Sequence, residues 1–106
     1  MNEERLRKLK EWEAQKPDDA FLKFAIAQEY ISAGNEEDAL KYYKVLVDKF
    51  PDYLATYYQL GQLLEKTGQT EEAMYAYRKG KAVAEKGKDF KTLGELNEAL
   101  MLLEDE

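Results

Sequence analysis

The feature that most constrains this chain is an internal repeat with a period of 34 residues. Pro17 and Pro51 are 34 positions apart (51 − 17), and so are Gly34 and Gly68. The same spacing relates Asp18 to Asp52, Glu37 to Glu71, Ala39 to Ala73 and Tyr43 to Tyr77. Self-similarity at such a period, with helical patterning inside it, is typical of helical hairpins that bury each other's apolar faces. The sequence therefore predicts an all-α fold, an α-solenoid of antiparallel helical hairpins.

The positions of proline, glycine and capping residues predict about six helices. We expect one over residues 3–15, one that carries residues 21–31, and others over residues 36–50, 53–66, 70–86 and 89–104, in a single domain spanning 1–106. Within it, 1–17 is a flanking helix, 18–51 and 52–85 are two repeats, and 88–106 is a C-terminal capping helix. Asp18, Asp19 and Asn35 are suited to cap helix N-termini, while Gly34, Gly68 and Gly87 are expected to close helices.

The flanking helices are predicted to cover the open apolar ends of the two repeats, because an array of about three units is needed for stability. In the first helix, Leu9 and Trp12 should cover one side of the next helix. In the last helix, a stripe of apolar residues should face inward; it comprises Phe90, Leu93, Leu96, Leu100 and Leu103. An alternative is that the last helix folds across the binding face and leaves little site.

Composition excludes several classes of function. The chain has no cysteine and no histidine, which removes thiol nucleophiles, histidine acid–base chemistry and nearly all zinc sites. Ser32 is the only serine, and no glycine-rich phosphate loop is present. We therefore expect no enzyme activity, no catalytic residue, no cofactor and no metal.

Charge and hydropathy bear on partners and location. The net charge of −6 argues against nucleic acid, which requires a cationic surface. No apolar run approaches the ~20 residues that span a bilayer, and the charged start lacks a signal-peptide core. We expect a cytoplasmic protein without membrane contact, either a monomer or a weak homodimer.

The repeats resemble the tetratricopeptide repeat family, a 34-residue helix-turn-helix. In the second repeat, Leu60, Gly61 and Ala73 match the family pattern, with Tyr57 and Tyr77 at its large aromatic positions. The first repeat is similar through Ile26, Ala27, Tyr30, Ala39, Tyr43 and Pro51, with Lys23 in place of the first aromatic. Gly80 stands where the family prefers alanine. The resemblance implies a right-handed superhelix, with small residues where helix backbones approach closely.

The resemblance also implies a concave groove, lined by the first helix of each repeat, that holds a peptide. By helical phase, Phe24, Gln28 and Ile31 should face this groove from the first repeat, and Tyr58, Gln62 and Glu65 from the second. Phe21 and Gln59 should lie near its rim. The tyrosines at positions 30, 43, 57 and 77 are interpreted as core residues instead. Family members that bind a C-terminal carboxylate have Lys and Asn at the positions that Phe24 and Gln28 occupy here. The resemblance therefore does not imply binding of an acidic tail.

The residues leave two functions open. The first is a non-catalytic adaptor or scaffold that binds a peptide segment of a partner protein in the groove. The alternative is a structural module that self-associates through its terminal helices, where Met101 and Leu102 are candidate exposed apolar residues.

Overall fold

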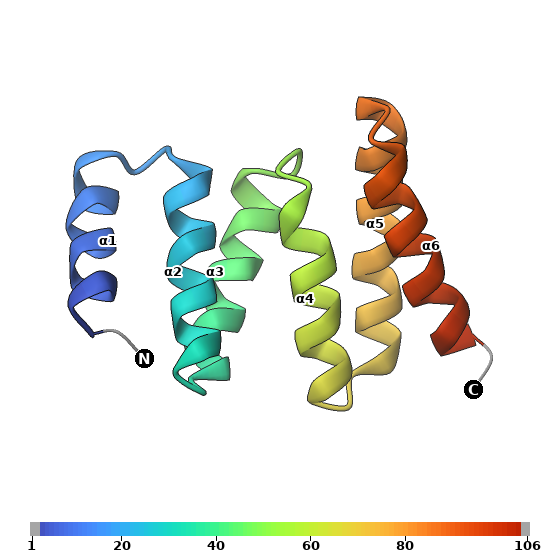
Figure 1. Cartoon of the computed structure of the whole chain (residues 1–106), viewed down its shortest axis with the longest axis horizontal. Helices are drawn as coiled ribbons and strands as arrows, with labels where there is room; N and C mark the ends of the chain where they lie inside the picture. Colours follow the sequence, from blue (N-terminus) through green and yellow to red (C-terminus); the bar gives the residue numbers. More distant parts are fainter. Residues whose placement is uncertain (1–2, 105–106) are drawn as a thin grey trace. The chain divides into compact units, whose positions relative to one another are not determined.

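The computed structural model describes residues 3–104, and every regular element in that range is an α-helix (Figure 1). The helices are α1 (Glu3–Gln15), α2 (Ala20–Ser32), α3 (Glu36–Lys49), α4 (Ala55–Lys66), α5 (Thr70–Gly87) and α6 (Phe90–Glu104). The predicted all-α fold is thus confirmed, with helix ends within about two residues of those expected from the sequence.

Short polar side chains begin three of the helices. The carboxylate of Asp19 accepts a hydrogen bond of 3.1 Å from the backbone N–H of Leu22, and so caps α2. Asn35 accepts one of 3.2 Å from Asp38 at the start of α3. Asp89 accepts the backbone N–H of Thr92 at 3.0 Å and caps α6, and this bond holds the pKa of Asp89 below its usual value.

Two of the three predicted glycine turns are confirmed. Gly34 and Gly68 have φ angles of 76° and 79°, in the left-handed region that glycine enters without a steric penalty. The expectation for Gly87 was wrong, because α5 continues through Gly87 and the left-handed residue is Lys88, with φ 57°. The N–H of Lys88 bonds to Ala84 and Glu85, so the turn is closed one residue later than predicted.

The chain divides after Tyr53 into two compact units. Unit 1 contains α1, α2 and α3, and unit 2 contains α4, α5 and α6. In unit 1, α2 packs against both α1 and α3; in unit 2, α5 packs against both α4 and α6 (Figure 1). Each unit is therefore a helical hairpin with one additional helix.

The core of unit 1 lies between α2 and α3. Its most buried side chains are Ile26, Ala27, Ala39, Tyr43 and Leu46, each with no exposed surface. Two of these five residues are alanine, which lets the two helix backbones approach closely.

Polar contacts hold α1 on the rest of unit 1. Arg5 forms an ion pair of 2.7 Å with Glu29, and Glu13 forms one of 2.9 Å with Lys23. The hydroxyl of Tyr42 also donates a hydrogen bond of 3.0 Å to Glu13. The inner face of α1 therefore follows Arg5, Leu9 and Glu13, at a spacing of four residues.

That spacing explains why one expectation about α1 was wrong. Leu9 is buried, as predicted, whereas Trp12, which was expected to face inward, is 51% exposed. At 3.6 residues per turn, a step of three residues moves about 60° around the helix, whereas a step of four stays closer to the same face. Trp12 consequently lies beside the buried face rather than on it.

In unit 2, two glycines allow side chains to reach the backbone of a neighbouring helix. A Cβ atom placed on Gly61 would lie 2.2 Å from the ring of Tyr77, and one on Gly80 would lie 2.7 Å from the Cβ of Tyr57. Tyr57, Tyr77 and Leu96 are almost completely buried. Glycine at position 80, where the family prefers alanine, is thus explained by the close approach of Tyr57 and Leu96 to α5.

The apolar stripe of α6 is narrower than predicted. Leu96 and Leu100 are buried and Leu93 and Leu103 are half-buried, in agreement with the expectation. Phe90 is 69% exposed, because two successive steps of three residues carry it away from the face of Leu96.

Within residues 3–104, no helix is long and apolar enough to cross a membrane.

Candidate functional site

Three of the predicted site residues line one pocket in unit 2. The pocket has a volume of about 310 Å³ and lies between α4 and α6, both of which pack against α5. Its α4 wall consists of Tyr58, Gln62 and Glu65, all predicted from helical phase. Its α6 wall consists of Glu95, Glu98, Ala99 and Leu102. The α6 helix therefore lies beside this face of α4 and forms the second wall of the pocket.

A buried tyrosine of α5 positions the polar side chains of the α4 wall. The amide of Gln62 donates a hydrogen bond of 2.7 Å to the hydroxyl of Tyr77, and that hydroxyl donates one to Glu65. The ring of Tyr58 lies 6.1 Å from the ring of Tyr77, measured between centroids, with the planes inclined at 46°. Tyr77 therefore contacts all three predicted residues on α4.

The surroundings of Tyr77 keep its hydroxyl neutral. Burial and the hydrogen bond to Glu65 both raise the pKa of Tyr77 well above its ordinary value of about 10, because each disfavours the phenolate. At neutral pH the hydroxyl thus remains a donor to Glu65 and an acceptor from Gln62.

Unit 1 contains a matching arrangement at positions 34 residues earlier. The hydroxyl of Tyr43 donates a hydrogen bond to the side-chain oxygen of Gln28, whereas the equivalent hydroxyl of Tyr77 accepts one from the amide of Gln62. The ring of Phe24 lies 6.2 Å from that of Tyr43 and 5.7 Å from that of Tyr53. Phe24 and Gln28 are thus held by the same α3 tyrosine.

The other three predicted site residues do not line the unit 2 pocket. Phe21 and Ile31 are 62% and 36% exposed on α2. Gln59 is half-buried on α4 and does not line the unit 2 pocket. Their assignment to a groove stays a prediction.

The four α6 residues of the pocket were not predicted from the sequence. Glu95, Glu98, Ala99 and Leu102 follow the spacing i, i+3, i+4 and i+7, so they occupy one face of α6. This spacing is visible in the sequence. The apolar stripe of α6 predicts a capping helix, and the sequence alone does not indicate that the neighbouring polar face forms a wall of the site.

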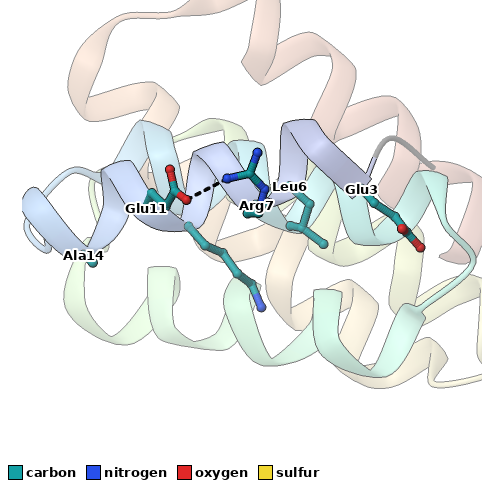
Figure 2. A pocket seen from close by; sticks show the side chains of 6 residues that line it. Glu3, Leu6, Arg7, Glu11 and Ala14 are labelled. Atoms are coloured by element: carbon teal, nitrogen blue, oxygen red, sulfur yellow. Dashed lines mark hydrogen bonds and ion pairs between the residues drawn. The ribbon is translucent and has the colours of Figure 1, made fainter.

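A hollow on α1 does not form an equivalent site. It has a volume of about 540 Å³ and is lined by six residues of α1 alone, of which Figure 2 labels Glu3, Leu6, Arg7, Glu11 and Ala14. Arg7 and Glu11 form an ion pair of 2.9 Å with each other across this surface (Figure 2). Because its whole lining comes from one helix, it is a solvated helix face.

The described part of the chain offers no metal site either. In residues 3–104, no group of three or more Asp or Glu side chains is arranged to hold a metal ion, the carboxylates of the unit 2 pocket included. The pocket presents carboxylates, an amide, a phenol ring and apolar carbon. Such a surface is suited to non-covalent binding.

Helical hairpins with matching tyrosine contacts define a helical-repeat protein. The sequence profile described as tetratricopeptide repeat matches residues 30–93, more than half of the chain. The chain therefore belongs to the tetratricopeptide repeat family, whose members are generally non-enzymatic and mediate contacts between proteins.

Solved structures agree with this assignment. A crystal structure of a tetratricopeptide repeat domain protein from Salinibacter ruber is 38% identical, with a TM-score of 0.79, and the match covers 83% of this chain and 98% of that one. A solution structure from the same organism is 38% identical with a TM-score of 0.80, covering 84% and 90%. A solution structure of a Bordetella parapertussis protein is 26% identical with a TM-score of 0.79, covering 94% and 87%. No curated protein matches the chain.

Proposed function

We propose that this protein is a non-catalytic cytoplasmic adaptor that binds a peptide segment of another protein along α2 and α4. The observation that carries the proposal is the unit 2 pocket, in which Tyr58, Gln62 and Glu65 form one wall. Aromatic rings supply contact area at a low cost in conformational entropy, and glutamine amides bond to a peptide backbone as donor or acceptor.

The equivalent positions in unit 1 extend the proposal. Phe24 and Gln28 correspond to Tyr58 and Gln62 in the repeat, and each pair contacts a buried tyrosine of the following helix. In this proposal Ile31 also faces the groove, and Phe21 and Gln59 form its rim. Because this pair of an aromatic residue and a glutamine occurs in both repeats, the surface is suited to an extended peptide segment that contacts one pair after the other.

A peptide-display selection on the full chain tests the proposal. Peptides selected by the wild type should lose binding to a Tyr58→Glu variant, and to a Phe21→Glu, Ile31→Glu variant whose changes are on exposed positions. Tyr75→Glu is the matched control, because Tyr75 is an exposed aromatic of α5 that does not line the pocket. Circular dichroism checks the helicity of each variant. Equal binding by wild type and both groove variants would reject the groove.

Self-association through the terminal helices is the second candidate, favoured by exposed apolar residues on α6. Met101 and Leu102 are 62% and 66% exposed. Sedimentation velocity over a range of concentrations tests it, with a Met101→Glu, Phe90→Glu variant that leaves the pocket residues unchanged. A dimer that this variant dissociates would support self-association, and a monomer at all concentrations would exclude it.

A further inference from the structure

The size of the unit 2 pocket limits what it accommodates. Its volume of about 310 Å³ is at the lower end of the range of ligand pockets, roughly 300–1,000 Å³. That space suits one long side chain better than a whole peptide segment or a large cofactor. The pocket is therefore a place where one residue of a bound segment is recognised.

The pocket walls are negatively charged. Glu65 lies on the α4 wall and Glu95 and Glu98 on the α6 wall, and none of the seven lining residues is basic. A carboxylate ligand would meet three like charges, whereas a cationic group would meet three opposite ones. Since these carboxylates are not arranged as metal ligands, a compact metal ion is not the matching cation.

The pocket also has the apolar surface that a long basic side chain requires. Lysine and arginine carry an apolar stem of three or four methylene groups below the charged head. The ring of Tyr58 and the side chains of Ala99 and Leu102 offer carbon surface beside the carboxylates. A tyrosine ring also attracts a cation placed over its face.

The contacts of Glu65 leave it able to receive a ligand. Within residues 3–104, the hydrogen bonds to its carboxylate, from Tyr77 and from Gln62, both end on Oε2. Oε1 is left to accept a hydrogen bond from a bound group. Because a buried tyrosine fixes the carboxylate, little side-chain entropy is lost when a ligand binds.

We propose that the pocket between α4 and α6 binds an arginine or lysine side chain of the partner segment. This inference rests on the proposed function, because it names the residue type that the second repeat selects. Position 31, which corresponds to Glu65 in the first repeat, is an isoleucine, so the selection is confined to unit 2.

The first test uses nuclear magnetic resonance on the ¹⁵N-labelled full chain. The probes are N-acetyl-arginine-methylamide and its citrulline analogue, which has nearly the same shape and no charge. We expect the arginine probe to shift amide signals of α4 and α6 around the pocket, with an affinity at least about tenfold above that of citrulline. Equal affinity for the two probes, or no shifts with arginine, would overturn the proposal.

Two charge variants locate the effect. A Glu95→Gln, Glu98→Gln variant should weaken arginine binding by about tenfold, since both carboxylates line the pocket. A Glu71→Gln, Glu85→Gln variant removes the same total charge from exposed positions of α5 and should bind as the wild type does. Equal weakening in both variants would mean a general charge effect and would reject the pocket.

The peptide-display selection separates this inference from the proposed function. Enrichment of arginine or lysine, lost in selections on the Glu95→Gln, Glu98→Gln variant, would support both. Peptides that require Tyr58 but show no basic enrichment would overturn the inference and leave the adaptor function intact. A wild type that selects no peptide would overturn both.

Discussion

The hydroxyl of Tyr77 in α5 donates a hydrogen bond to the carboxylate of Glu65 in α4. This contact joins the buried core of unit 2 to the wall of its pocket, because the ring of Tyr77 has no exposed surface while Glu65 lines the pocket. The protonation state of a core residue therefore affects a residue of the candidate site.

The first prediction concerns alkaline pH. Burial raises the pKa of Tyr43, Tyr53 and Tyr77 above the ordinary value of about 10, so the folded state retains hydroxyl protons that the unfolded state loses. The contribution of these tyrosines to stability is complete below about pH 10 and is lost as the pH rises toward their pKa values in the folded state. Urea unfolding should show a free energy of unfolding that decreases above about pH 10, with a shallower decrease in Tyr77→Phe. A free energy independent of pH in this range would contradict the prediction.

The second prediction concerns glycines in helices of unit 2. A Cβ on Gly61 or Gly80 would lie less than 3 Å from a tyrosine side chain, so Gly61→Ala and Gly80→Ala should each lower the free energy of unfolding by about 1–3 kcal/mol. Gly94→Ala in α6 is the control, because beyond its chain neighbours and the backbone of its own helix no atom lies within 4 Å of its added Cβ. It should raise stability by about 0.5–1 kcal/mol through helix propensity. Chemical denaturation measures all three, and a stabilised Gly61→Ala would be inconsistent with the packing described.

The third prediction uses the two repeats as controls for each other. Asn35 caps α3 with its side chain, whereas Gln69, at the equivalent position before α5, makes no capping hydrogen bond. Gln69→Asn should raise the free energy of unfolding by about 0.5–1 kcal/mol, and Asn35→Gln should lower it by a similar amount. Thermal and urea unfolding of both variants check this. If the free energy of unfolding changes in the same direction in both variants, the two capping positions are not equivalent and the prediction is wrong.

The fourth prediction concerns the docking of α1. Glu13 pairs with Lys23 and accepts a hydrogen bond from Tyr42, and both Glu13 and Lys23 are largely buried. Glu13→Gln should lower the free energy of unfolding by about 1–2 kcal/mol, because Lys23 loses its counter-charge. It should also lower the pKa of Tyr42, which burial and the Glu13 hydrogen bond raise.

An exposed ion pair on the same helix is the control for that change. Glu11→Gln breaks the ion pair with Arg7, in which both side chains are more than half exposed. It should lower the free energy of unfolding by less than about 0.5 kcal/mol. Hydrogen exchange of the α1 amides reports both variants. Equal protection of α1 in the two would mean that Glu13 does not dock this helix.

Much of the fold was predictable because local signals agree with the repeat. The proline and glycine positions marked the helix ends, and the aromatic positions marked the core. Tyr43, Tyr57 and Tyr77 are indeed buried, and so are Ala27 and Ala39, at positions expected to be small. Each of these residues is constrained by contacts that the repeat itself contains.

The errors occurred where no repeat constrained the interpretation. Trp12, Phe90 and Gly87 all lie outside residues 18–85. Apolar character predicts an inward position for the two aromatic residues, and glycine predicts the helix end at position 87, but the structure shows neither. For the two aromatic residues, a spacing of three residues predicts a single face, although this spacing drifts around the helix. The sequence alone does not indicate the α6 wall of the pocket, because only contact with a second helix gives Glu95 and Glu98 their place in a site.

Duplication made the two halves alike at Tyr43 and Tyr77 but left them different at Ile31 and Glu65. Position 31 presents an apolar side chain, whereas position 65 presents a carboxylate. Under the proposed function, the two repeats would therefore favour different side chains of a bound segment, and that difference would favour one orientation of the segment over its reverse.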